Sequence, residues 1–135
     1  MIRGTAVKLR IQSNSIRVRL DRKDLRELIE RGRVVDVLRF GPGSHHTFTY
    51  AVVVRAASPG RPRAHYHAGL LVVTIDPSDA AAWFEGDRVG FDHEHAVAGG
   101  TIRVILEKDF DCLDRQAGGE AEDALAFPSP SRVGG

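Results

Sequence analysis

The sequence predicts a small α+β domain built from two similar halves, and three observations support this fold class. Apolar and polar residues alternate near the N-terminus with the period of two that is typical of half-buried strands. Segments that open with Asp and carry an apolar stripe follow, as amphipathic helices do. The order of these elements repeats 55 residues later, in a chain whose 135 residues suit one domain.

The first half opens with a predicted hairpin. Apolar residues alternate with mainly basic ones over 7–11 and 16–20, and the turn-forming residues 13–15 lie between them. Asp21 is the expected N-cap of a helix that Gly32 ends. The strands expected next span residues 34–40 and 47–57, on either side of a turn at 41–43.

The second half repeats this order. Residues 16–35 align without gaps on residues 71–90, and the alignment pairs Asp21 with Asp76. Pro77 stands directly behind Asp76 and suits the first helical position. A strand, a tight turn and a second strand precede the helix, and a further strand and a closing strand over 101–110 follow it. The pattern therefore predicts a ββαββ duplication with halves at about 7–57 and 65–110.

Duplicated halves of this kind usually bury their apolar faces against each other. We therefore expect one compact domain over 1–113, mostly antiparallel, with a mixed sheet or partly closed barrel, two helices and a pseudo-twofold axis. A ligand groove would lie between the halves. Residues 114–135 are predicted to form a largely irregular tail, in which Phe127-Pro128 either docks on the body or stays free.

The charge distribution limits the classes of partner. The formal net charge is only +1, which argues against nucleic-acid binding. Residues 1–33 are nevertheless rich in Lys and Arg, and the chain from Glu107 onward is rich in Asp and Glu. This asymmetry indicates either an acidic ligand or mutual attraction between the two segments, and we favour the attraction.

Cysteine content and hydropathy indicate the compartment. The single cysteine excludes an intrachain disulfide and fits a reducing environment. No apolar run approaches the roughly 20 residues that span a bilayer. No segment resembles a signal peptide. We therefore expect a soluble cytoplasmic protein without a membrane partner.

Six histidines stand in three close pairs. His65 and His67 are two residues apart on a predicted strand, so both point to one face and could bind a divalent transition metal. His93 and His95 are expected in an exposed loop. No third ligand follows from the spacing, and solvated histidines at strand edges are the simpler interpretation.

The segment from Glu107 to Cys112 is the densest cluster of reactive side chains. Alternation along a strand places Lys108 and Cys112 on one side and Glu107 and Asp109 on the other. The carboxylates could bind either a divalent cation or the basic N-terminal hairpin. We predict ligand binding by Glu107, Lys108, Asp109 and Cys112. Cys112 itself is more typical of a small buried hydrophobe than of a nucleophile, so no catalytic residue is assigned.

Two motifs near the ends of the chain carry a family resemblance. Asn14 to Leu20 reads N-S-I-R-x-R-L, and Glu107 to Leu113 reads E-K-D-F-x-C-L, followed by Phe127-Pro128-x-Pro130. With these motifs the chain resembles an uncharacterised bacterial domain of unknown function over most of its length. It departs from the pattern at Ser129, where Asn is typical, and in an insert over 58–67. The resemblance implies no activity, but it implies that the closing motif and Phe127-Pro128 share one surface.

These observations favour a binding or accessory protein that recognises a small ligand, a metal or a protein partner. The alternative is a small metal-dependent enzyme that uses histidine and carboxylate ligands, so the sequence leaves enzymatic activity open. A third hypothesis is anion or nucleic-acid binding on the basic hairpin face, by Arg10, Arg17 and Arg19. Exposed strand edges would also permit a homodimer.

Overall fold

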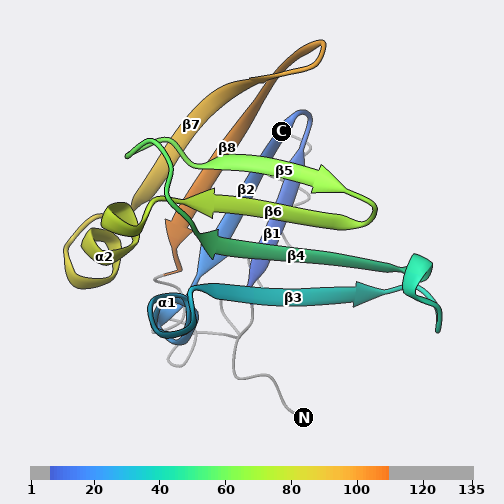
Figure 1. Ribbon diagram of the computed structural model, residues 1–135, viewed down its shortest axis with the longest axis horizontal. Helices are drawn as coiled ribbons and strands as arrows, with labels where there is room; N and C mark the ends of the chain where they lie inside the picture. Colours follow the sequence, from blue (N-terminus) through green and yellow to red (C-terminus); the bar gives the residue numbers. More distant parts are fainter. Residues whose placement is uncertain (1–6, 110–135) are drawn as a thin grey trace, which may run out of the picture.

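Eight strands and two α-helices make up residues 7–109, the part of the chain that the computed structural model describes (Figure 1). The first half contains β1 (Lys8–Gln12), β2 (Ser15–Leu20), α1 (Arg22–Arg31), β3 (Arg33–Arg39), a short 3-10 helix (Ser44–His46) and β4 (Thr47–Val54). The second half contains β5 (Arg63–His67), β6 (Leu70–Ile75), α2 (Pro77–Glu85), β7 (Gly90–Val97) and β8 (Gly100–Lys108). The order ββαββ is therefore present twice, as predicted.

The strands form two four-stranded mixed sheets and no closed barrel. Sheet A has the strand order β1-β2-β8-β7, and sheet B has the order β3-β4-β6-β5. In each sheet the two central strands are parallel, whereas both outer strands are antiparallel to their neighbours. Each sheet therefore combines one hairpin from each half. In Figure 1 sheet B lies in front of sheet A, and the strands of the two sheets cross.

Equivalent hydrogen bonds relate the two halves by a pseudo-twofold axis. The amide of Thr49 donates to the carbonyl of Gly69 at 2.8 Å, and the amide of Arg103 donates to the carbonyl of Asn14 at 3.1 Å. Gly69 follows Asn14 by 55 residues, and Arg103 follows Thr49 by 54 residues. The registers of the two parallel strand pairs agree with the same offsets. The predicted pseudo-twofold repeat is thus confirmed.

The gapless alignment holds through the helices but not beyond them. Val34 in β3 pairs with Val52 in β4. The equivalent pair in the second half is Phe91 in β7 with Leu106 in β8. Two extra residues between α2 and β7 therefore move the equivalent of Val34 from Val89 to Phe91.

Helix α1 begins at a complete capping box. The Asp21 carboxylate accepts a hydrogen bond from the amide of Asp24 at 2.8 Å. The Asp24 carboxylate accepts one from the amide of Asp21 at 2.9 Å. These bonds satisfy two backbone donors that a helix start otherwise leaves unpaired. Gly32 ends the helix at φ 80°, a left-handed conformation that favours glycine.

Helix α2 begins at the equivalent aspartate. The Asp76 carboxylate accepts a hydrogen bond from the amide of Ser78 at 3.0 Å, and Pro77 occupies the first turn. A second carboxylate oxygen of Asp76 accepts from the amide of Ala57 at 3.0 Å. Hydrogen bonds from the Ser78 side chain and the Ala57 amide lower the pKa of Asp76. Asp76 therefore also holds the segment that leaves β4.

The core lies between the two sheets, and the helices cover one end of it (Figure 1). Leu28 of α1 and Trp83 of α2 are both fully buried at equivalent positions. The ring of Trp83 meets Phe91 edge-on at 5.3 Å between centroids, and its Nε1 donates to the carbonyl of Val89 at 3.1 Å. The strands add buried aliphatic side chains, among them Ile16, Val18, Leu20, Val34, Val52, Leu71, Val73, Ile75, Val104 and Leu106.

Several predictions fall on other parts of the chain. The expected tail over 114–135, with Phe127-Pro128, lies outside the described residues, and so does Cys112. Neither α1 nor α2, the helices of the described region, has the length and apolar character needed to cross a membrane.

Candidate functional site

Glu107 and Asp109 point from the outer face of sheet A, the face directed away from the core. The Oε1 atom of Glu107 lies 3.2 Å from Nε of Arg19 and 3.6 Å from Nη1 of Arg17. The Oδ2 atom of Asp109 lies 2.8 Å from Nζ of Lys8, and the Asp109 side chain is only 5% exposed. Both carboxylates therefore pair with the basic N-terminal hairpin, one of the two interactions that the sequence allowed.

Lys108 points to the opposite side of β8, as the alternation predicted. Its Nζ donates to the carbonyl of Gly86 at 2.9 Å, at the C-cap of α2. A cation at a helix C-terminus satisfies a free carbonyl and interacts favourably with the helix dipole. Ligand binding by Glu107, Lys108, Asp109 and Cys112 remains a prediction.

Further ion pairs cover the outer face of sheet A. Arg103 donates two hydrogen bonds to the Asp92 carboxylate, from Nε at 2.9 Å and from Nη2 at 2.5 Å. This bidentate pair lowers the pKa of Asp92 and raises that of Arg103. Arg17 and Arg19, two of the three arginines considered for anion or nucleic-acid binding, already have a partner in Glu107. The charges of this face are thus largely balanced within the fold.

His65 and His67 lie on β5 and face the same side of sheet B, as the period of two predicted. Both side chains are exposed. Burial has the largest effect in lowering the pKa of His65, followed by the charges of Arg63, His95 and Arg55. Among residues 7–109 no three His, Cys, Asp or Glu side chains lie close enough to hold a metal ion. The described part of the chain therefore supplies no third ligand to this pair.

His95 joins the edges of the two sheets. The prediction of an exposed loop at His93 and His95 is wrong, because both lie in β7 and His95 is 6% exposed. The Nε2 atom of His95 accepts a hydrogen bond from the amide of Ala64 in β5 at 3.0 Å. Because Nε2 accepts, Nδ1 is the ring nitrogen that donates, and it lies 3.1 Å from the carbonyl of Ala96. His95 of sheet A therefore accepts a hydrogen bond from a backbone amide at the edge of sheet B.

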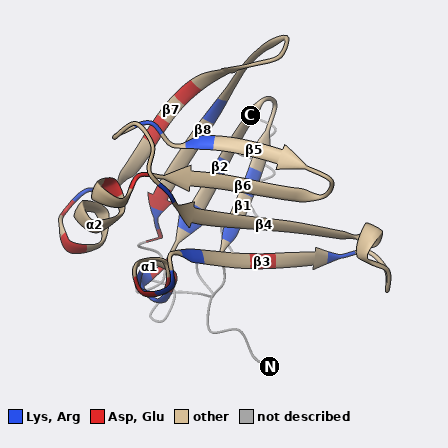
Figure 2. Cartoon of the chain, viewed as in Figure 1, with Lys and Arg blue, Asp and Glu red and all other residues tan. Residues whose placement is uncertain are grey.

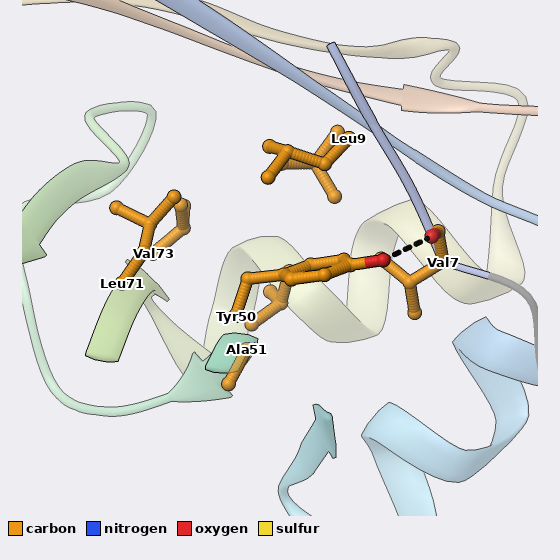
Figure 3. Close-up of a pocket in the computed structure, with 8 residues that line it drawn as sticks. Val7, Leu9, Tyr50, Ala51, Leu71 and Val73 are labelled. Atoms are coloured by element: carbon orange, nitrogen blue, oxygen red, sulfur yellow. Dashed lines mark hydrogen bonds between the residues drawn. The ribbon is translucent and has the colours of Figure 1, made fainter. Parts of the chain in front are cut away.

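The space between the sheets is narrow and apolar near β1 (Figure 3). Its lining includes Val7, Leu9, Leu71 and Val73, and it has no room for a water molecule. The hydroxyl of Tyr50 donates to the carbonyl of Val7 at 3.3 Å across this space. The ligand groove expected between the halves is therefore closed at this place.

The strands of sheet B carry fewer charged residues than those of sheet A (Figure 2). The strand registers place uncharged side chains over its centre, namely Val35, Val37, Thr49, Ala51, Val53, Leu70, Val72 and Thr74. Val37 is 37% exposed and Leu70 is 42% exposed. Charged side chains stand at the borders of this face, at Arg33, Arg39, Arg55 and Arg63. No Asp or Glu of the described strands points from it.

The pseudo-twofold axis pairs each position on the outer face of sheet A with one on the outer face of sheet B, so the charges of the two faces can be compared position by position. In sheet A Arg19 lies beside Glu107, and the equivalent neighbours in sheet B are Thr74 and Val53. Four further positions show the same kind of replacement and pair Arg17 with Val72, Arg103 with Thr49, Asp92 with Val35 and Glu94 with Val37. At the border the direction reverses, because Gly90 and Ala96 of sheet A match Arg33 and Arg39 of sheet B. One backbone architecture therefore carries an outer face with charges over its centre and an outer face with an uncharged centre.

Sequence reasoning did not identify this face with its uncharged centre. The signal was present in the alignment of 16–35 on 71–90, where Arg17 and Arg19 meet Val72 and Thr74. The alternation in each segment shows that one side is buried, but it does not show which strands lie beside it. The face became visible only when the structure placed β3 and β4 beside β6.

Comparison with known proteins adds one match. The model of a family of unknown function, DUF7009, matches residues 7–131. No curated protein and no solved structure matches the chain.

Proposed function

The chain belongs to this family of unknown function, DUF7009, and on that premise we propose that it is a non-enzymatic binding protein. The binding surface is the outer face of sheet B, where another protein docks. The contrast between matched positions of the two outer faces carries this proposal. Where sheet A balances its own charges, the centre of sheet B has none, and Val37 on the edge strand β3 and Leu70 at the start of β6 are exposed.

The proposed surface has the composition of a protein interface. Its centre lacks charged side chains, and arginines stand around it, at Arg33, Arg39, Arg55 and Arg63. Charged residues are typically depleted at interface cores, whereas arginine is enriched in interfaces. Apolar contacts at the centre would supply affinity, and the arginines would orient the partner.

The charges at the border indicate the kind of partner. Electrostatic complementarity requires acidic groups around an apolar centre on the opposing surface. A second copy of this chain would bring arginine against arginine at the same border. The proposed partner is therefore a different protein, with an apolar patch and an acidic rim.

Photo-crosslinking from matched positions tests the proposal. A photoreactive phenylalanine analogue replaces Leu70 in one variant and Ser15, its pseudo-twofold equivalent on sheet A, in the other. We expect position 70, but not position 15, to crosslink to one particular protein in cells that produce the chain. That protein is then purified and its affinity measured by calorimetry. Leu70→Lys should weaken binding by about tenfold or more, because it places a charge in an apolar contact.

Three outcomes would contradict the proposal. In the first, the two positions yield the same adducts. In the second, position 70 crosslinks only to a second copy of the chain. In the third, the purified protein binds the wild type and the Leu70→Lys variant equally well. Circular dichroism of each variant checks that the substitution at this exposed position leaves the fold intact.

A further inference from the structure

The pseudo-twofold axis also relates one ion pair of sheet A to an unusual pair of residues in sheet B. Lys8 and Asp109 form a 2.8 Å ion pair at one corner of sheet A. Arg63 on β5 is the equivalent of Lys8 on β1, as the antiparallel registers show. Arg55 is the equivalent of Asp109, because the Arg55 amide donates to Ile75 at 2.9 Å just as the Asp109 amide donates to Leu20 at 2.8 Å.

The equivalent corner therefore carries two cations where sheet A carries a cation and an anion. In the described part of the chain neither Arg55 nor Arg63 forms an ion pair, and both are exposed. By contrast, Lys8, Arg17, Arg19 and Arg103 on sheet A all pair with carboxylates.

The two acids at the start of α2 already have other partners. Asp76 accepts hydrogen bonds from the amides of Ala57 and Ser78. Asp79 accepts one from the amide of Gly60 at 2.5 Å. These contacts hold the loop between β4 and β5. The two arginines beside that loop have no ion pair with either acid.

His65 adds a third nitrogen group to this corner. It lies two residues after Arg63 on the same face of β5. Burial lowers the pKa of His65 most, and the positive charges of Arg63 and Arg55 are among the further causes. The charges of both guanidinium groups therefore disfavour protonation of this ring.

We propose that Arg55, Arg63 and His65 form a binding site for a phosphate group, either free or in the monoester of a small molecule. Two permanent cations match a dianion better than they match a single carboxylate. Guanidinium groups suit the geometry of phosphate oxygens, and a protonated His65 would donate a further hydrogen bond. This site shares Arg55 and Arg63 with the border of the docking surface, but phosphate binding requires neither the apolar centre of the face nor the partner.

The probe is inorganic phosphate, titrated at constant ionic strength while NMR follows the ring protons of the histidines. We expect a saturable shift at His65 and a rise in the pKa of His65, because the bound dianion offsets the charges of the arginines. Acetate should give no saturable shift. Methyl phosphate forms a parallel arm, in which tighter binding than that of phosphate would assign the site to monoesters and weaker binding to the free ion.

Matched variants locate the site. Arg55→Gln and Arg63→Gln should each weaken phosphate binding by about tenfold or more, since each removes charge-assisted hydrogen bonds. Arg39→Gln removes the same charge from another border of the same face and should leave binding unchanged. Backbone amide spectra without phosphate check that each variant is folded.

The proposal fails if phosphate produces no saturable shift at His65. It also fails if acetate binds as phosphate does, or if Arg39→Gln weakens binding as much as Arg63→Gln. Neither result would depend on the partner protein, so the two proposals can fail separately.

Discussion

At the scale of single residues, His95 shows how one side chain joins the two sheets. Its Nε2 accepts a hydrogen bond from the amide of Ala64. This amide lies at the edge of β5, and the pairing of β5 with β6 does not use it. The side chain is buried, so water does not readily replace it. A buried donor without a partner destabilises the folded state by about 1–3 kcal/mol.

His95→Leu should therefore lower the free energy of unfolding by about 1–3 kcal/mol, because the Ala64 amide loses its acceptor while the site stays apolar. His95→Gln, which offers a carbonyl oxygen, should recover part of this loss. Urea denaturation measures both. His93→Leu on the same face of β7 is the control, and an equal effect of His93→Leu and His95→Leu would contradict the assigned role.

For residues that the structure describes, prediction from the sequence succeeded where it depended on the alternation of a strand, as two pairs of side chains show. His65 and His67 share a face, and Glu107 and Asp109 share another. It failed where the answer depended on a contact between distant segments. The pairing of His95 with Ala64, 31 residues away, has no counterpart in local spacing.

At the scale of elements, the two helices begin in the same way. Asp21 and Asp76 each cap a helix, with an acidic residue in the first turn. Asp21 takes part in a capping box, whereas the Asp76 carboxylate also accepts a hydrogen bond from the amide of Ala57. The helix starts therefore contribute to stability through different secondary contacts.

We expect Asp21→Ala and Asp76→Ala each to lower the free energy of unfolding by about 0.5–2 kcal/mol, the usual effect of losing an N-cap. Thermal and urea denaturation followed by circular dichroism provide the measurement. Lys23→Ala, at an exposed position in α1, serves as the control. If either capping variant is as stable as that control, its aspartate does not act as described.

The type and order of the elements followed from the sequence with little error. The helix over Arg22–Arg31 begins directly after the predicted cap, and β3 and β4 fall within a few residues of the expected strands. Turn residues and caps act over a few positions, so local sequence determines them. The two extra residues before β7 were missed because loop length leaves no periodic signal.

At the scale of the whole molecule, the halves exchange hairpins between two sheets. Each half contributes two strands to sheet A and two to sheet B. The sequence predicted the repeat and the mixed strand pairing, but it did not show that the strands divide into two sheets. Alternation identifies a buried side of a strand, whereas the neighbours of that strand depend on contacts across the whole chain.

This arrangement gives the molecule two outer faces of common design and different chemistry. Charged side chains on the outer face of sheet A form ion pairs with one another, such as Glu107 with Arg19 and Asp92 with Arg103. Exposed ion pairs of this kind usually contribute little to stability. Sheet B lacks these pairs and has an uncharged centre, which is the basis of the proposed docking surface.

The most direct test uses one substitution on each face at equivalent positions, with the protein that crosslinks at position 70 as the binding partner. Val72→Arg gives sheet B the side chain that sheet A has, and Arg17→Val gives sheet A the side chain that sheet B has. Calorimetry should show that Val72→Arg weakens binding by about tenfold or more, whereas Arg17→Val leaves the affinity unchanged. Unchanged affinity in Val72→Arg, or a loss confined to Arg17→Val, would contradict the assignment of the binding surface to sheet B.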